Sequence, residues 1–245
     1  MTAVDLQGAF NVRDLGGLRT GDGRVTRDRV IYRGDSLARI TAADAEVLFG
    51  ELGVGAIIDL RTKEETEGET IEFPVPSYRF SILREGRLGR EPFPSDDPVE
   101  LAKVYLSNLD DGREAVAAAI GTAAGYLADG VPSLFHCAAG RDRTGIIAAL
   151  LLDLADVTDS QIAADYVASN RHARLVTSKL AANPLYADSG ARGREVILLQ
   201  RQTILEFLRL MREQLGGSSQ FLLDAGVSAD AIESIREHLV GRADG

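Results

Sequence analysis

The stretch from Val131 to Leu154 reads VPSLFHCAAGRDRTGIIAALLLDL and holds three kinds of segment in close succession. Val131–Phe135 is a short apolar run, which predicts a buried strand. The following HCAAGRDRTG carries charge and glycine, which predicts a loop. From about Thr144 to Leu154 the residues are apolar on nearly every side, which predicts a buried helix. A strand that leads through a loop directly into a helix is typical of α/β folds.

This loop has the composition of an anion-binding site. Cys137 and Arg143 are six residues apart, with Gly140 between them. In a loop that curls before a helix, successive backbone N–H groups from Ala138 to Arg143 form an anion nest at the helix N-terminus. The same partial positive charge favours the thiolate form of the cysteine, and the arginine offers a fork for two phosphate oxygens. The loop therefore predicts attack on phosphorus through a phosphocysteine, with a buried core thiol as the alternative for Cys137.

The segment His136–Gly145 resembles the active-site motif of cysteine-dependent protein tyrosine phosphatases. More narrowly, it is similar to the bacterial tyrosine/serine phosphatase family whose loop reads H-C-x-A-G-K-D-R-T-G. Three earlier segments match that family in order, and they are NVRDLGG at Asn11–Gly17, YRGD at Tyr32–Asp35 and IDLR at Ile58–Arg61. The resemblance implies an α/β fold with a protein tyrosine phosphatase-like sheet flanked by helices. It also implies action on phosphotyrosine and, for some members, on phosphoserine, phosphothreonine or phosphoinositides.

The resemblance also implies roles for single residues. Cys137 is the expected nucleophile, Arg143 clamps the transferred phosphoryl group, and the Thr144 hydroxyl donates to the thiolate during phosphocysteine hydrolysis. His136 is expected to orient the loop by hydrogen bonding. The expected phosphate-binding residues are Ala138, Ala139, Gly140, Arg141, Asp142 and Arg143. Arg141 stands where the family usually has lysine, which replaces a point charge by a fork and bears on substrate preference.

The general acid has two candidates. Many tyrosine phosphatases use an aspartate on a loop some distance upstream of the cysteine, where this chain has Asp96 and Asp97. The narrower family implies Asp142, inside the loop itself. The flanking Arg141 and Arg143 favour the ionised carboxylate, whereas a bound phosphate dianion favours the protonated acid. We expect Asp142 to be the acid and keep the upstream pair as the alternative.

Other charged residues of the matching segments are expected to form structural ion pairs. Such pairs are more common than catalytic groups among buried charges. This applies to Arg13, Asp14, Arg33, Asp35, Asp59 and Arg61. As an alternative, Arg13 or Arg61 lines the pocket. Three scattered histidines and one cysteine predict no metal site, and the chemistry requires no cofactor.

Composition excludes several classes of function. The chain has 27 basic and 37 acidic residues, a net charge of −10 and a pI of about 4.9, which disfavours nucleic-acid binding and broad adhesion to anionic membranes. The most apolar window, Ile146–Leu152, is too short to span a bilayer, so no stable membrane insertion is expected. The N-terminus has no apolar run, which predicts a cytoplasmic protein, although export without a signal peptide stays open.

We expect residues 1–245 to form a single phosphatase domain whose C-terminal third is mostly helical. Strands are predicted at 30–32, 54–60 and 131–135, and a surface loop at 84–98. Helices are predicted at 41–52, 101–109, 113–127, 144–154, 159–170, 194–214 and 229–239. The segment at about 169–194 is either a plain surface helix with a loop or a lid over the pocket, because Asn183-Pro184 and Gly190 to Gly193 permit hinges.

The sequence leaves several functions open. The first is a phosphatase acting on phosphotyrosine in proteins, with inorganic phosphate as the product. The second is a phosphoinositide phosphatase, which shares the loop and needs a more basic rim. A phosphate-binding module without turnover and a sulfur-transferring cysteine enzyme are further alternatives, although the retained Cys137, Asp142, Arg143 and Thr144 argue against the module.

Overall fold

A five-stranded mixed sheet forms the centre of the part of the chain that the computed structural model describes, residues 2–83, 97–181, 184–186 and 198–241. The strands, in spatial order, are β1 (Arg13–Asp14), β2 (Ile31–Gly34), β5 (Ser133–His136), β3 (Ala56–Asp59) and β4 (Ser77–Arg79). β1 pairs antiparallel with β2, and the other pairings are parallel. The predicted α/β class and the strands at 30–32, 54–60 and 131–135 are confirmed with shorter bounds, whereas β1 and β4 were not predicted.

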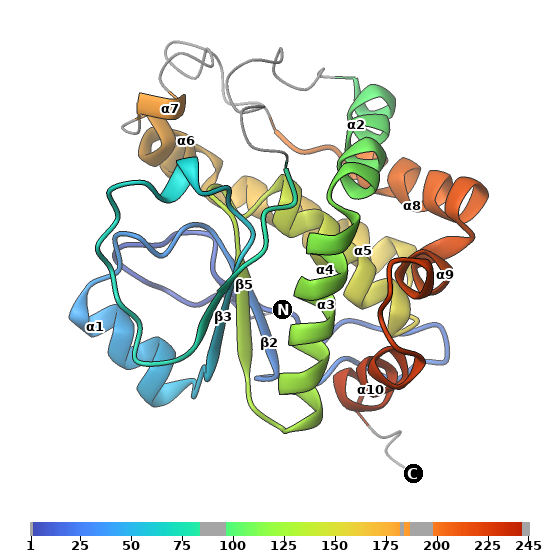
Figure 1. The fold of residues 1–245 in the computed structure, drawn as a ribbon, viewed down its shortest axis with the longest axis horizontal. Helices are drawn as coiled ribbons and strands as arrows, with labels where there is room; N and C mark the ends of the chain where they lie inside the picture. Colours follow the sequence, from blue (N-terminus) through green and yellow to red (C-terminus); the bar gives the residue numbers. More distant parts are fainter. Residues whose placement is uncertain (1, 84–96, 182–183, 187–197, 242–245) are drawn as a thin grey trace.

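Two cores form on the two faces of the sheet because side chains alternate along each strand. Phe135 of β5 and Ile58 of β3 belong to the larger core, which the α3 and α4 helices share. Leu134 and Ile57, their neighbours in sequence, belong to the smaller core, which includes Leu48. Figure 1 shows α1 on one side of the strands and α3, α4 and α5 with the C-terminal helices on the other.

The helices confirm the expected helical C-terminal third. They are α1 (Ala42–Ala45), which continues as a π-helical turn (Glu46–Glu51), α2 (Pro98–Asp111), α3 (Arg113–Ala128), α4 (Asp142–Leu154), α5 (Asp159–Ala168), α6 (Ala173–Ala181), α7 (Pro184–Tyr186), α8 (Arg201–Leu215), α9 (Gly217–Asp224) and α10 (Ala229–Leu239). Short 3-10 turns cover Glu64–Thr66 and Ser169–His172. None of the helices in the described residues is long and apolar enough to cross a membrane.

Several predicted bounds are wrong. The helix predicted from 194 begins at Arg201, because residues 198–200 are not helical and 194–197 lie outside the described residues. Of the loop predicted at 84–98, residues 84–96 lie outside the described residues. Its last two residues, Asp97 and Pro98, form the N-cap and the first residue of α2. There Asp97 accepts hydrogen bonds from the first-turn N–H groups, and Pro98 occupies the first turn, where its missing N–H costs nothing.

The sheet brings the matching segments together at one edge. Parallel pairing places Gly34 at the end of β2 and Asp59 at the end of β3 on either side of His136, the last residue of β5. The chain after each strand therefore leaves from the same edge, as ligand sites in α/β sheets require. Cys137 lies at this edge, directly after His136.

Candidate active site

Residues 137–143, here called the Cys137 loop, follow β5 and include the first two residues of α4. Cys137 is 2% exposed, and the Gly140 N–H donates to its Sγ at 3.3 Å. Gly140 has φ +66°, and a Cβ there would lie 2.6 Å from the carbonyl carbon of Gly34, so only glycine is compatible with this turn. Because α4 begins at Asp142, the thiol lies at the N-terminal, partially positive end of a buried helix.

Groups from the N-terminal part of the chain hold the carbonyl side of this loop. Asn11 Nδ2 donates to the carbonyl oxygens of Ala139 (3.2 Å) and Gly140 (2.9 Å), and Arg33 Nη2 also donates to that of Gly140 (2.9 Å). The Ser36 N–H donates to the carbonyl of Ala138 at 3.2 Å. These bonds fix the peptide planes of the loop and tie it to the segments that the sequence motifs marked.

Arg13, Arg33 and Asp165 form a first buried cluster, the Asp165 cluster. Arg13 Nε donates to Asp165 Oδ1 at 2.8 Å, and Arg33 Nη1 donates to Oδ2. Arg13 Nη1 donates to Asn11 Oδ1 at 2.7 Å, which connects the cluster to the loop. Burial opposes ionisation of Asp165, but the charges and hydrogen bonds of Arg13 and Arg33 outweigh it and keep its pKa below the usual range.

Arg143, Glu65 and Tyr186 form a second cluster, the Glu65 cluster. Arg143 Nη1 and Nη2 donate to the two carboxylate oxygens of Glu65 at 2.6 and 2.7 Å, and Tyr186 Oη donates to Glu65 Oε1. Burial opposes both charges, but the pair stabilises them: the pKa of Arg143 lies well above and that of Glu65 below the usual range. The bidentate bond fixes the plane of the guanidinium at the start of α4.

A third pair lies at the end of β3. Arg61 donates to both oxygens of Asp59, and it also bonds Glu69 and Ser36 Oγ. Burial opposes ionisation of Asp59, but His136 and Arg61 outweigh it and lower its pKa to about 2. His136 is itself buried, which lowers its pKa, and its Nδ1 lies 3.3 Å from the carbonyl oxygen of Cys137.

The two candidate acids lie in different surroundings. Asp142 is half-buried at the start of α4, where Tyr105 Oη donates to its Oδ1. Asp97 is exposed and caps α2 by accepting the N–H groups of Val99 (2.8 Å) and Glu100 (3.4 Å). Asp96 lies outside the described residues.

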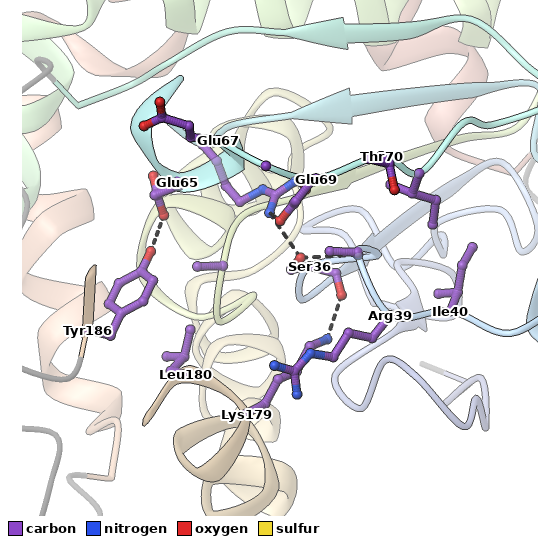
Figure 2. A pocket seen from close by; sticks show the side chains of 15 residues that line it. Ser36, Arg39, Ile40, Glu65, Glu67, Glu69, Thr70, Lys179, Leu180 and Tyr186 are labelled. Atoms are coloured by element: carbon purple, nitrogen blue, oxygen red, sulfur yellow. Dashed lines mark hydrogen bonds and ion pairs between the residues drawn. The ribbon is translucent and has the colours of Figure 1, made fainter. Parts of the chain in front are cut away.

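A cavity of about 620 Å³ opens beside Ala138 of the Cys137 loop. Its wall includes Ser36 and Arg61, which follow β2 and β3, and Glu65 from the 3-10 turn at Glu64–Thr66. Lys179 of α6 and Tyr186 of α7 complete this part of the wall. Figure 2 shows the Tyr186 ring on one side of this space, with its hydroxyl bonded to Glu65, and Lys179 bonded to the Ser36 carbonyl. The cavity therefore extends from the loop to the segment that was predicted as either lid or surface helix.

The sequence model described as "Tyrosine phosphatase family" matches residues 4–241 of the 245. The chain belongs to the tyrosine phosphatase family. It is 35% identical over 184 residues to "Putative tyrosine-protein phosphatase H16_A0669" of Cupriavidus necator, an alignment that covers 70% of this chain and only 64% of that protein. It is 31% identical to a tyrosine-protein phosphatase of Nostoc commune, over 83% of this chain and 71% of that one. It is 25% identical to the triple specificity protein phosphatase PtpB of Mycobacterium tuberculosis, over 98% and 100%.

The structure shows where the predicted residues lie, and their roles stay predictions. Cys137 and Arg143 share one loop, as predicted. Arg13 forms an ion pair in the Asp165 cluster, whereas Arg61 both forms ion pairs, with Asp59 and Glu69, and lines the cavity. Thr144 is fully buried, and its Oγ1 has no hydrogen-bond partner among the described residues, so its role stays a prediction.

The ion pair expected for Asp14 does not occur among the described residues. Instead, the Asp14 carboxylate accepts the backbone N–H groups of Gly16 (2.8 Å) and Arg29 (2.6 Å) and so shapes a turn. Asp35 does pair, with Lys179 at 2.9 Å, while its other oxygen accepts two backbone N–H groups.

Sequence analysis missed five residues of this site. Asp165, Tyr105 and Tyr166 lie in helices that were predicted without any functional role. Glu65 lies in a charged run, and Tyr186 lies in the segment that was predicted as either lid or surface helix. Only Asp165 had a usable signal, since a carboxylate between Ala164 and Tyr166 on a buried helix face needs a partner.

Proposed function

We propose that this tyrosine phosphatase family enzyme removes phosphate from phosphotyrosine through a phosphocysteine formed on Cys137. The observation that carries the proposal is the position of its Sγ at the N-terminal end of α4, where the Gly140 N–H donates to it. Arg143 stands at the same helix end, with its plane fixed by Glu65. Nucleophile, amide donors and guanidinium are the components that phosphoryl transfer without a metal needs.

The proposed reaction has two steps. The thiolate of Cys137 attacks phosphorus, and the bond from phosphorus to the tyrosine oxygen breaks while Asp142 donates a proton to that oxygen. Water then attacks the phosphocysteine and gives its proton to Asp142, the sulfur–phosphorus bond breaks, and inorganic phosphate leaves. Thr144 stabilises the departing thiolate in this second step. The role of Arg143 is to bind the equatorial phosphate oxygens, whose negative charge develops in both steps.

The range of substrates is a separate part of the proposal. Phosphoserine, phosphothreonine and phosphoinositides are further candidates, and the name of the triple specificity relative supports a broad range. The cavity beside Ala138 carries Arg39, Arg61 and Lys179 as well as Glu65, Glu67 and Glu69. This mixture of charges favours a phosphopeptide over a multiply phosphorylated lipid, because carboxylates repel extra phosphates. A phosphoinositide phosphatase is therefore the second candidate function.

We further propose that residues 1–245 act as one phosphatase domain in the cytoplasm. The catalytic thiol must stay reduced, which the cytoplasm favours, and Cys137 is a free cysteine. Cell fractionation with an antibody tests the compartment. The lid function of residues 169–194 also stays a proposal, supported by Lys179, Leu180 and Tyr186 in the cavity wall.

One assay panel tests the function. Wild type and Cys137→Ser are measured on para-nitrophenyl phosphate, phosphopeptides, soluble phosphoinositides and thiosulfate, each with and without EDTA. We expect wild type to hydrolyse the aryl phosphate and the phosphotyrosine peptide equally well with EDTA, and Cys137→Ser to be inactive. Cys137→Ser should still bind phosphate, because the amide groups and Arg143 remain. Activity that requires added metal, or a Cys137→Ser variant with more than a few per cent of wild-type activity, would refute the mechanism.

A further inference from the structure

Two buried tyrosines connect the candidate acid to the protein interior. Tyr105 of α2 and Tyr166 of α5 are each 1% exposed. Tyr105 Oη donates to Asp142 Oδ1, and the Tyr166 hydroxyl lies 2.7 Å from Tyr105 Oη. Three helices, α2, α4 and α5, thus contribute to one chain of hydrogen bonds that ends at the Cys137 loop.

The direction of the hydrogen bonds from Tyr166 through Tyr105 to Asp142 follows from the number of protons that each hydroxyl group carries. Burial and the charge of Asp142 raise the pKa of Tyr105 well above its usual range, and burial also raises that of Tyr166. Both phenols therefore keep their single proton at neutral pH. An ionised carboxylate can only accept, so the Tyr105 hydroxyl donates its hydrogen bond to Asp142, and the Tyr166 hydroxyl donates its hydrogen bond to Tyr105.

We propose that Tyr105 and Tyr166 are positioning residues that assign the catalytic proton of Asp142 to its Oδ2. Since Oδ1 accepts the hydrogen bond from Tyr105, a proton that the carboxylate takes up binds to Oδ2. No hydrogen bond to Oδ2 occurs within the described part of the chain, and Asp142 is half-buried, so Oδ2 is available to a substrate. The inference rests on the proposed function, in which Asp142 protonates the leaving oxygen.

Rigid packing keeps this arrangement in place. The Tyr105 ring meets the rings of Tyr166 and Phe207 edge-to-face, with centroids 6.4 and 6.2 Å apart. Such contacts hold a ring independently of its hydroxyl group. A change of either tyrosine to phenylalanine therefore removes one hydrogen bond and leaves the packing, which makes the pair suitable for a test.

The other charges near this chain are already compensated or belong to the loop. Arg33, from β2, acts on Tyr166 and is paired with Asp165, which Arg13 also contacts. Arg141, next to Asp142 in the loop, acts on Tyr166 as well. The remaining titratable groups of the loop are Cys137 and Arg143, which is paired with Glu65. Changing a tyrosine to phenylalanine leaves all of these charges in place, so a change in the pH profile reports the lost hydrogen bond.

The test compares Tyr105→Phe with wild type on a phosphotyrosine peptide and on para-nitrophenyl phosphate, over a range of pH. We expect kcat on the peptide to fall about tenfold, whereas the activated ester, which needs little acid, should change by less than about threefold. The alkaline limb of the kcat profile should move up by about one pH unit, because the carboxylate loses a stabilising donor. Tyr166→Phe is the matched control, because it removes only the outer bond and should move the limb in the same direction by less.

Equal losses on both substrates with an unmoved alkaline limb would overturn the inference, because a purely structural role predicts that result. Protection of Cys137 from iodoacetate by inorganic phosphate shows that each variant is folded. If Tyr105→Phe does not fold, an unmoved limb in Tyr166→Phe overturns the inference in its place. A wild type without phosphatase activity would instead refute the proposed function, so the two failures are distinguishable.

Discussion

The Asp165 cluster and the Glu65 cluster use the same chemistry, a buried carboxylate that binds guanidinium groups. They differ in whether any of their residues line the cavity. Both oxygens of Asp165 are bonded to arginines whose side chains are 0% and 7% exposed. In the Glu65 cluster, Arg143 belongs to the Cys137 loop, and Tyr186 and Glu65 line the cavity. The first cluster supports the loop from the interior, whereas the second orients a loop side chain beside open space.

This difference shows how to tell a structural ion pair from a functional one. Burial and bond lengths are similar in the two clusters and do not distinguish them. The distinguishing feature is whether any member of the cluster borders a space that a ligand can enter: Glu65 and Tyr186 line the cavity, whereas no residue of the Asp165 cluster does. A closed pair is expected to matter for stability, and a pair at a cavity for activity. The predictions below test this separation.

The largest effect is expected for Arg143→Lys. One ammonium group cannot replace a planar fork that binds Glu65 in the structure and phosphate in the proposed mechanism, so kcat/KM on a phosphotyrosine peptide should fall about 10³-fold. The free energy of unfolding should change much less than activity does. Arg209→Lys, on an exposed face of α8, is the matched control and should keep wild-type kcat/KM. Comparable losses in both variants would remove the distinction between the clusters.

A smaller loss is expected for Asp142→Asn, which belongs to the loop but to neither cluster. Without a proton donor, hydrolysis of phosphotyrosine should fall about 10²-fold, and hydrolysis of an activated aryl ester much less. The alkaline limb of the pH–rate profile should flatten. The control is Asp96→Asn combined with Asp97→Asn, in which asparagine keeps the α2 cap. If the control shows the leaving-group-dependent loss instead, the upstream loop carries the acid.

The Asp165 cluster is expected to affect stability. Asp165→Asn leaves Arg13 and Arg33 buried without a countercharge, which should lower the free energy of unfolding by about 3–5 kcal/mol in urea titrations. The protein that remains folded should keep most of its kcat, since no group of this cluster borders the cavity. A variant of wild-type stability with lost activity would place Asp165 in the catalytic machinery and contradict the comparison.

The Asp59–Arg61 pair is expected to make the free energy of unfolding depend on pH in the acid range. The pKa of Asp59 is about 2 in the folded chain, below its value in an unfolded one. Its contribution is therefore complete above about pH 4 and is lost as the pH falls toward 2. The difference in free energy of unfolding between wild type and Asp59→Asn should shrink by about 2 kcal/mol between about pH 5 and pH 2. A difference that does not change with pH would show that the pair contributes no such linkage.

How far the sequence predicts this site depends on whether the information is local. The strand, loop and helix around Cys137 follow from apolar runs and from Gly140, which are adjacent in the chain. The contacts that position Arg143 are not local: Glu65 lies 78 residues away, in a run of charges that looks like solvated surface. Asp165 lies 152 residues from Arg13, with no pattern that connects them. Such partners are selected by the tertiary fold, so sequence periodicity does not reveal them.

Chemical trapping of the intermediate tests the central claim most directly. Wild type is mixed with a phosphotyrosine peptide, quenched with acid within the first turnover, digested and analysed by mass spectrometry. The account predicts one added phosphoryl group on the peptide that contains Cys137, which disappears as turnover is completed and never forms in Cys137→Ser. Full hydrolysis with no phosphate on Cys137 at any quench time, or with phosphate on another residue, would contradict it.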